Sequence, residues 1–116
     1  MDVHQPATTL SILHLEDSAN DHRLACRVLD KSRFQYTIRR VETLSAFTDA
    51  ALTGAFDLVL ADYRLAGFTA VDAWTSLPTN CLRPPFILLS GAIGEAAAVS
   101  AIQLGISDYL HKDDLG

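Results

Sequence analysis

The chain has 116 residues, a length that suits one compact domain with one core. A hydrophobic fraction of 49% excludes a disordered chain, and no apolar run approaches the roughly 20 residues of a membrane span. The net charge of −5 argues against direct nucleic-acid binding, because such surfaces need a basic patch.

Residues 1–9 are polar and predict a flexible leader, followed by a single folded domain over residues 10–116. The leader lacks the apolar core of a secretory signal peptide. Cys26 and Cys81 lie far apart without a CxxC motif, which is typical of free thiols in a reducing compartment. We therefore expect a cytoplasmic protein without membrane contact.

Five short runs of aliphatic and β-branched residues predict strands, at 10–15, 35–41, 56–61, 86–89 and 108–111. Amphipathic segments with capping residues predict helices between these strands, at 20–32, from Thr43 to Gly54, from Thr69 to Pro78, and at 95–104. This alternation predicts an α/β fold with three layers, in which a doubly wound parallel sheet carries helices on both faces.

The residues after the last predicted strand suffice for only one helical turn, so we expect a fifth helix to be truncated or absent. The surface formed by the segments 95–104 and 108–111 would then keep apolar edges uncovered. The first segment is rich in alanine and offers a smooth face for another helix, formed by Ala96, Ala97, Ala98 and Ala101. We expect either a longer native protein or a homodimer formed through this surface.

Chemically active residues follow the predicted strands at their carboxyl ends, namely Glu16, Asp17, Asp62, Ser90 and Lys112. In a doubly wound sheet these ends surround one crevice. Three neighbouring carboxylates repel one another unless a cation joins them, and oxygen ligands suit Mg²⁺ or Mn²⁺. A lysine and a hydroxyl beside them can bind phosphoryl oxygens, which predicts an acceptor site for phosphoryl transfer.

Each of these residues also has a purely structural interpretation. Glu16 or Asp17 alone could be an acid at a helix N-terminus, and Asp62 alone could form an Asx-turn. Ser90 could cap a turn and Lys112 could be a solvated charge. The combination favours a site because all five residues fall at carboxyl ends of strands.

Four stretches together resemble the response-regulator receiver domain of two-component signalling: ILHLEDS at 12–18, LVLADYRLAGF at 58–68, FILLSGAIG at 86–94 and GISDYLHKDDL at 105–115. The resemblance implies a flavodoxin-like (CheY-like) fold with strand order 2-1-3-4-5. It also implies that the domain is no enzyme beyond autocatalytic formation and hydrolysis of its own acyl-phosphate.

By this resemblance, Asp62 is the phosphoacceptor. Mg²⁺ would be bound directly by Asp17, Asp62 and the backbone carbonyl of Arg64, with Glu16 acting through water.

The resemblance also assigns Ser90 as the switch hydroxyl, Tyr109 as the switch aromatic and Lys112 as the phosphoryl-binding lysine. The implied partners are a sensor histidine kinase or phosphotransfer protein upstream, and an effector or fused output domain downstream.

Two positions depart from the family pattern. Ala66 and Asp113 each stand where receiver domains usually have proline. Proline would restrict the loop after Asp62, so Ala66 loosens it.

Three other functions remain open alternatives. A Mg²⁺-dependent hydrolase with an aspartyl-phosphate intermediate would resemble haloacid dehalogenases, but that class has a second acid two residues after the nucleophile, where this chain has Arg64. A protein-interaction module without phosphorylation would not need Asp62 and Lys112. A flavin-binding flavodoxin would need a phosphate loop rich in serine, threonine and glycine after the first strand.

Overall fold

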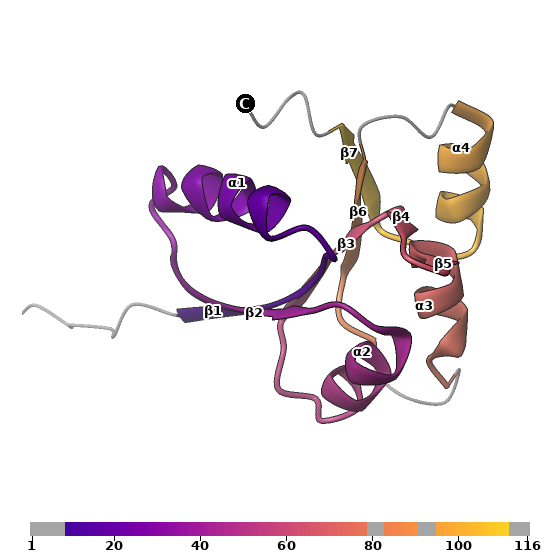
Figure 1. Cartoon of the computed structure of the whole chain (residues 1–116), viewed down its shortest axis with the longest axis horizontal. Helices are drawn as coiled ribbons and strands as arrows, with labels where there is room; N and C mark the ends of the chain where they lie inside the picture. The colour runs from indigo at the N-terminus through magenta and orange to yellow at the C-terminus, as the bar shows by residue number, and fades with distance from the viewer. Residues whose placement is uncertain (1–8, 79–82, 91–94, 112–116) are drawn as a thin grey trace, which may run out of the picture.

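A computed structural model of the chain describes residues 9–78, 83–90 and 95–111. Its main sheet has five parallel strands in the order β2-β1-β3-β6-β7 (Figure 1). The strands are β1 (Thr9–Leu15), β2 (Gln35–Val41), β3 (Leu58–Asp62), β6 (Phe86–Ser90) and β7 (Asp108–His111). If only the five strands of this sheet are numbered along the chain, β6 and β7 become the fourth and fifth strands. The strand order is then the predicted 2-1-3-4-5, so the predicted fold is confirmed.

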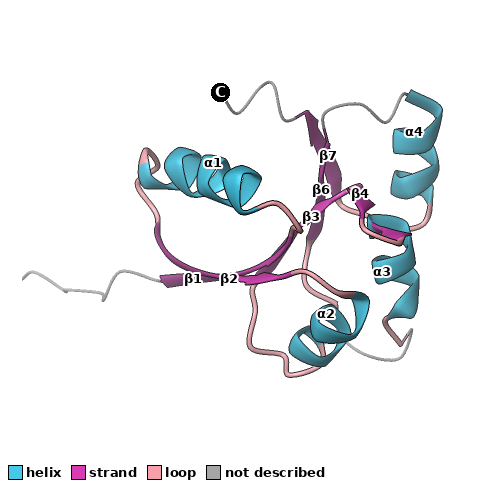
Figure 2. Ribbon diagram, in the orientation of Figure 1, coloured by secondary structure: helices cyan, strands magenta, loops and turns pink. Residues whose placement is uncertain are grey.

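Helices cover both faces of the sheet, with α1 (Ala19–Asp30) on one face (Figure 2). The other face carries α2 (Leu44–Ala51), α3 (Ala70–Ser76) and α4 (Glu95–Gln103). Side-chain oxygens of Ser18, Thr43 and Thr69 accept hydrogen bonds from the first turns of α1, α2 and α3. None of the helices in the described part of the chain is long and apolar enough to cross a membrane.

Two predicted boundaries differ from the structure by two residues, and a side chain bonds to the backbone at each of them. The third strand begins at Leu58 rather than Phe56, and the Asp57 carboxylate accepts a 2.9 Å hydrogen bond from the Ser11 amide. Helix α1 ends at Asp30 rather than Ser32, whose hydroxyl donates to the carbonyl of Leu29 at 2.6 Å.

A short hairpin after β3 was not predicted. Strands β4 (Arg64–Leu65) and β5 (Phe68–Thr69) pair antiparallel around Ala66 and Gly67. Gly67 has a φ of +88°, the left-handed conformation that the second central residue of a type II turn requires. Strands of two residues are too short to show the alternation of apolar and polar residues that predicts a strand.

The core has two parts, one on each face of the sheet. The larger part packs Phe47, Trp74 and Phe86 beneath α2, α3 and α4, with ring centroids 6.0 Å and 5.4 Å from Phe86. The smaller part lies under α1 and is built on Ile12, Leu60 and Leu89. An apolar groove of about 130 Å³ opens beside it, lined by Ala25, Val28, Leu29, Leu58, Leu60, Leu89 and Leu110.

The alanine face predicted for α4 is wrong at one position, Ala101, whereas Ala96 is exposed and Ala97 is half-buried. Ala101 is buried against the core, whereas Val99 and Ile102 are 54% and 49% exposed. The exposed surface of α4 therefore includes two large aliphatic side chains in addition to alanine.

Candidate functional site

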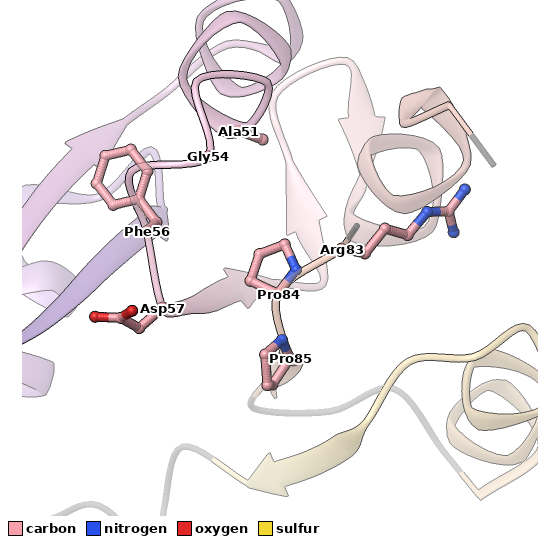
Figure 3. Close-up of a pocket in the computed structure, with 7 residues that line it drawn as sticks. All are labelled: Ala51, Gly54, Phe56, Asp57, Arg83, Pro84 and Pro85. Carbon is pink, nitrogen blue, oxygen red and sulfur yellow. The ribbon is translucent and has the colours of Figure 1, made fainter. Parts of the chain in front are cut away.

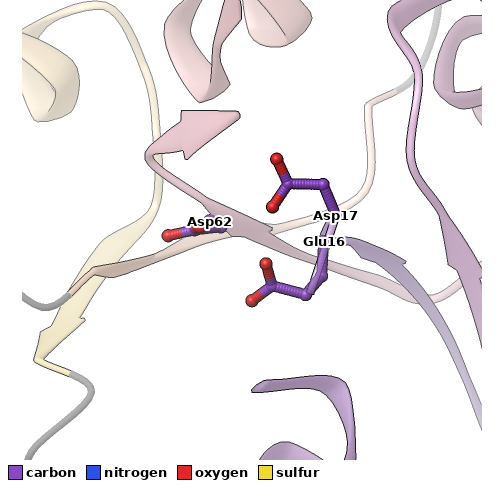
Figure 4. A group of neighbouring side chains, drawn as sticks. All are labelled: Glu16, Asp17 and Asp62. Atoms are coloured by element: carbon purple, nitrogen blue, oxygen red, sulfur yellow. The ribbon is translucent and has the colours of Figure 1, made fainter. Parts of the chain in front are cut away.

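Three carboxylates meet at the carboxyl edge of the sheet. Glu16 and Asp17 follow β1, and Asp62 is the last residue of β3, which pairs directly with β1. Each offers an oxygen atom, and these atoms all lie within 4.8 Å of one another (Figure 4). The parallel pairing of β1 and β3 brings these acids together, although Asp17 and Asp62 are 45 positions apart in the sequence.

Glu16 is held rigidly in this group. Its side chain is only 1% exposed, and its carboxylate accepts a 3.3 Å hydrogen bond from the Ser18 amide. Its own amide donates to the carbonyl of Val41 at 3.0 Å, which fixes it to the end of β2. Burial of a carboxylate is costly unless other groups satisfy it, so the position favours a functional role.

Arg40 supports the same residue and was not among the site residues predicted from the sequence. Its guanidinium donates to the backbone carbonyl of Glu16 at 3.2 Å and pairs with the Glu42 carboxylate. The sequence shows an arginine near the end of the neighbouring strand, but this alone does not predict a contact with Glu16. The contact can be inferred only when the register of β1 and β2 is known.

Asp17 has an exposed carboxylate that accepts a 2.9 Å hydrogen bond from the Ala66 amide. This bond connects the loop after β1 to the turn of the β4–β5 hairpin. Asp17 is thus oriented by the segment that follows Asp62.

Asp62 is partly buried, and the backbone after it is fixed by two hydrogen bonds. The Tyr63 amide donates to the carbonyl of Leu89 at 3.1 Å, and the Ala70 amide donates to the carbonyl of Tyr63 at 2.9 Å. Arg64 begins β4 two residues later, with an exposed side chain. A solvent-open pocket lies along this hairpin, lined by Tyr63, Arg64, Leu65, Phe68 and Thr69.

The other predicted site residues are described only in part. Ser90 ends β6, the strand next to β3, and its backbone pairs with His111. Tyr109 lies in β7 and pairs with Leu88 of β6. Its half-buried ring packs against the larger core cluster. Lys112 and Asp113 lie outside the described residues.

The acidic group fits a divalent cation. Its donor atoms are all carboxylate oxygens, which suit Mg²⁺ and Mn²⁺ rather than softer metals. An ion here would offset the repulsion between three neighbouring negative charges, one of them on the buried side chain of Glu16.

A larger pocket, of about 420 Å³, lies at the opposite edge of the sheet, where β3 and β6 begin (Figure 3). Its two charged residues do not converge on a ligand. Asp57 already accepts the hydrogen bond from Ser11, and the Arg83 guanidinium stacks 4.3 Å from the ring centroid of Trp74. We therefore place the candidate site at the acidic edge.

Comparison with known proteins identifies the family of the chain. The family model described as the response regulator receiver domain matches residues 12–114. A search of curated proteins found no match to this sequence.

Solved structures share the fold. The signal receiver domain of NarL from Mycobacterium tuberculosis is 20% identical, with a TM-score of 0.78, covering 90% of this chain and 85% of that one. The Mn²⁺-bound response regulator Rcp1 is 23% identical, with a TM-score of 0.76 and coverage of 91% and 86%. The phosphorylated cyanobacterial phytochrome response regulator RcpA is 21% identical, with a TM-score of 0.75 and coverage of 93% and 86%.

Proposed function

The chain belongs to the response regulator receiver domain family, and on that premise we propose that its Asp62 carboxylate accepts a phosphoryl group from a histidine kinase or phosphotransfer protein. Membership makes the chain a signal-transduction module of a two-component system. The observation that carries the proposal is the group of three carboxylate oxygens within 4.8 Å, with Asp62 as a member.

In the proposed step, an Asp62 oxygen attacks the phosphorus of a phosphohistidine. The bond between phosphorus and the histidine nitrogen breaks as the new bond between phosphorus and oxygen forms, and the imidazole leaves and takes up a proton from solvent. The proposal assigns Lys112 and the Ser90 hydroxyl to the phosphoryl oxygens, because a cation and a hydroxyl donor stabilise the charge there.

A divalent cation would be bound by Asp17, Asp62 and the carbonyl of Arg64, with Glu16 acting through water. When bound, it would neutralise the charge that accumulates when a phosphoryl group approaches three carboxylates. The similar regulator Rcp1 was solved in a Mn²⁺-bound form, which supports binding of a divalent metal by this fold.

Labelling with a small phosphodonor such as acetyl phosphate tests the proposal. In the presence of Mg²⁺, the wild-type chain should acquire one stable phosphoryl group. Asp62→Asn should abolish labelling because the nucleophilic oxygen is lost. Asp49→Asn, which changes an exposed acid on α2, is the matched control and should label normally.

The same experiment separates the alternative functions. Rapid turnover of donor without stable label would favour the aspartyl-phosphate hydrolase. No labelling of a well-folded chain would favour the inert interaction module. Normal labelling of Asp62→Asn would contradict the assignment of the phosphoacceptor.

We also propose that phosphorylation is transmitted through Ser90 and Tyr109 to the surface formed by α4 and β7. Tyr109 is half-buried against the core, so an inward and an outward rotamer would expose different surfaces. The outer side of α4 carries exposed aliphatic groups, including Val99 and Ile102, which suit an effector, an output domain or a second copy of the chain.

Equilibrium ultracentrifugation with and without phosphodonor tests the homodimer. Phosphorylation should raise the average mass of the wild type, and Ile102→Glu should prevent that rise. Leu52→Glu is the control, because Leu52 is equally exposed at the end of α2. A monomer at high concentration in both states would contradict dimer formation.

A further inference from the structure

Three side chains with metal-binding chemistry gather under α1, outside the acidic site. His22 and Cys26 lie four residues apart on α1 and therefore share one face of the helix. His14 lies on β1 beneath them and is 1% exposed. Its Nδ1 is 2.9 Å from the Nδ1 of His22, and the Nε2 of His22 is 3.6 Å from the Cys26 Sγ.

These distances match a known arrangement of metal ligands. In tetrahedral zinc sites, a Zn–N bond of about 2.1 Å and a Zn–S bond of about 2.3 Å place the nitrogen and sulfur about 3.6 Å apart. A hydrogen bond between two Nδ1 atoms needs one ring as the donor. If His22 donates, its Nε2 has a lone pair directed toward the thiol.

We propose that His22 Nε2 and Cys26 Sγ are two ligands of a site for Zn²⁺ or a similar thiolate-binding cation, with His14 as a positioning residue. Solvent molecules complete the coordination. Metal-binding histidines commonly donate their second ring N–H to an acceptor, and this bond sets the tautomer and orientation of the ring. In the tautomer in which His22 donates, the Nδ1 of His14 is that acceptor.

The surrounding charges affect the two ligands differently. Partial burial, and then the Arg40 guanidinium, lower the pKa of His22, so its imidazole stays neutral and able to bind metal. Burial, and then the carboxylate of Asp30, raise the pKa of Cys26. The thiol must therefore release its proton to solvent when a metal binds, while the charge of Asp30 attracts the cation.

This site is chemically distinct from the acidic edge. Its donors are nitrogen and sulfur, which prefer zinc or cadmium, whereas the acids offer only oxygen and suit Mg²⁺. A saturating concentration of Mg²⁺ should therefore leave the His22–Cys26 site available. The two sites can be measured separately in one sample.

Titration with Cd²⁺ in excess Mg²⁺ provides the test, read from the ultraviolet absorption of the cadmium–thiolate bond. We expect one such band per wild-type chain. Cys26→Ser should abolish it, and His22→Ala should weaken binding at least tenfold. Cys81→Ser, which removes the only other cysteine in the sequence, is the matched control and should retain the band.

Two further variants separate positioning from coordination. His14→Leu should keep the band but weaken binding by about 10–100-fold, as for other groups that orient metal ligands. His14→Gln offers an amide oxygen as acceptor and should recover part of the affinity. Asp62→Asn should bind Cd²⁺ like the wild type, because its carboxylate belongs to the other site.

A measurement on the unmodified chain covers the case in which a variant does not fold. Zn²⁺ should slow alkylation of Cys26 and leave alkylation of Cys81 unchanged, as read by mass spectrometry of peptides. A cadmium band that persists in Cys26→Ser, or alkylation of Cys26 that Zn²⁺ does not slow, would overturn the proposal.

Discussion

The backbone amide of Ala66 donates a 2.9 Å hydrogen bond to the carboxylate of Asp17. Receiver domains usually have proline at the position of Ala66, and proline has no N–H to donate. This departure from the family pattern therefore adds a contact between the hairpin and a proposed metal ligand.

Ala66→Pro should weaken Mg²⁺ binding several-fold, because Asp17 would lose the donor that orients it. The turn itself can accept proline, since the next residue, Gly67, has the positive φ of a type II turn. Ala66→Gly keeps the N–H and is the control. Calorimetric titration with Mg²⁺ measures the effect, and equal affinities in both variants would show that the hydrogen bond does not orient Asp17.

Arg64→Ala should shorten the lifetime of the phosphorylated form several-fold. Arg64 is exposed two residues after Asp62, where its guanidinium can pair with phosphoryl oxygens and shield them from water. Ala92, which lies outside the described residues, offers no side-chain hydrogen bond to orient a water molecule. We therefore expect slow dephosphorylation in the wild type.

Loss of label after removal of the phosphodonor measures this lifetime. Arg39→Ala changes an exposed arginine on β2 and serves as the control. Fast dephosphorylation of the wild type that Arg64→Ala leaves unchanged would contradict the shielding role.

Gly105→Ala should destabilise the fold more than Gly54→Ala. Both glycines have positive φ, at +106° and +71°, so both substitutions strain the backbone by about 1–2 kcal/mol. A Cβ at Gly105 would also lie 3.0 Å from the Trp74 ring, whereas one at Gly54 meets nothing within 4 Å. The Trp74 ring cannot easily withdraw, because its N–H donates to the carbonyl of Leu104 at 2.9 Å.

Urea unfolding of the two glycine variants and of Trp74→Phe measures this coupling. Trp74→Phe should cost about 1–3 kcal/mol through the lost hydrogen bond and packing. In the double variant, Gly105→Ala should cost less than it does alone, because the smaller ring leaves room for the methyl group. Strictly additive free energies would show that the ring and the glycine do not interact.

Tyr36 should make the fold sensitive to alkaline pH. A 2.5 Å hydrogen bond to the Asp30 carboxylate, and then burial, raise the pKa of Tyr36 from its usual value near 10 to about 12. The unfolded chain then loses the phenolic proton before the folded chain does. The stabilisation is complete below about pH 10 and is lost as pH rises toward 12.

Tyr36→Phe has no proton to lose and should be less stable than the wild type at neutral pH. The difference in unfolding free energy between the two proteins should shrink between about pH 10 and pH 12. Titrating groups that do not interact with Tyr36 are common to both chains and cancel in this comparison. A difference that stays constant over this range would mean that Tyr36 titrates alike in the folded and unfolded states.

The sequence alone predicted the strands of the main sheet, the helices, the fold and the candidate acids. The repeats of apolar residues that predict strands and helices involve only residues close together in the sequence. The capping residues Thr43 and Thr69 likewise directly precede the helices that they begin. Parallel order then follows from the alternation of elements, and it places Glu16, Asp17 and Asp62 at one edge. The family motifs extended this prediction to the roles of single residues.

Only the tertiary structure decided which distant groups touch. The bond from Ala66 to Asp17 spans 49 residues, and the bond from Arg40 to the Glu16 carbonyl spans 24. The meeting of His14 with His22 depends on where α1 crosses β1. Each of these contacts depends on the register of a strand or on the position of a helix, and packing of the whole core determines both. A shift of one residue along a strand would turn its side chains to the opposite face of the sheet and break the contact.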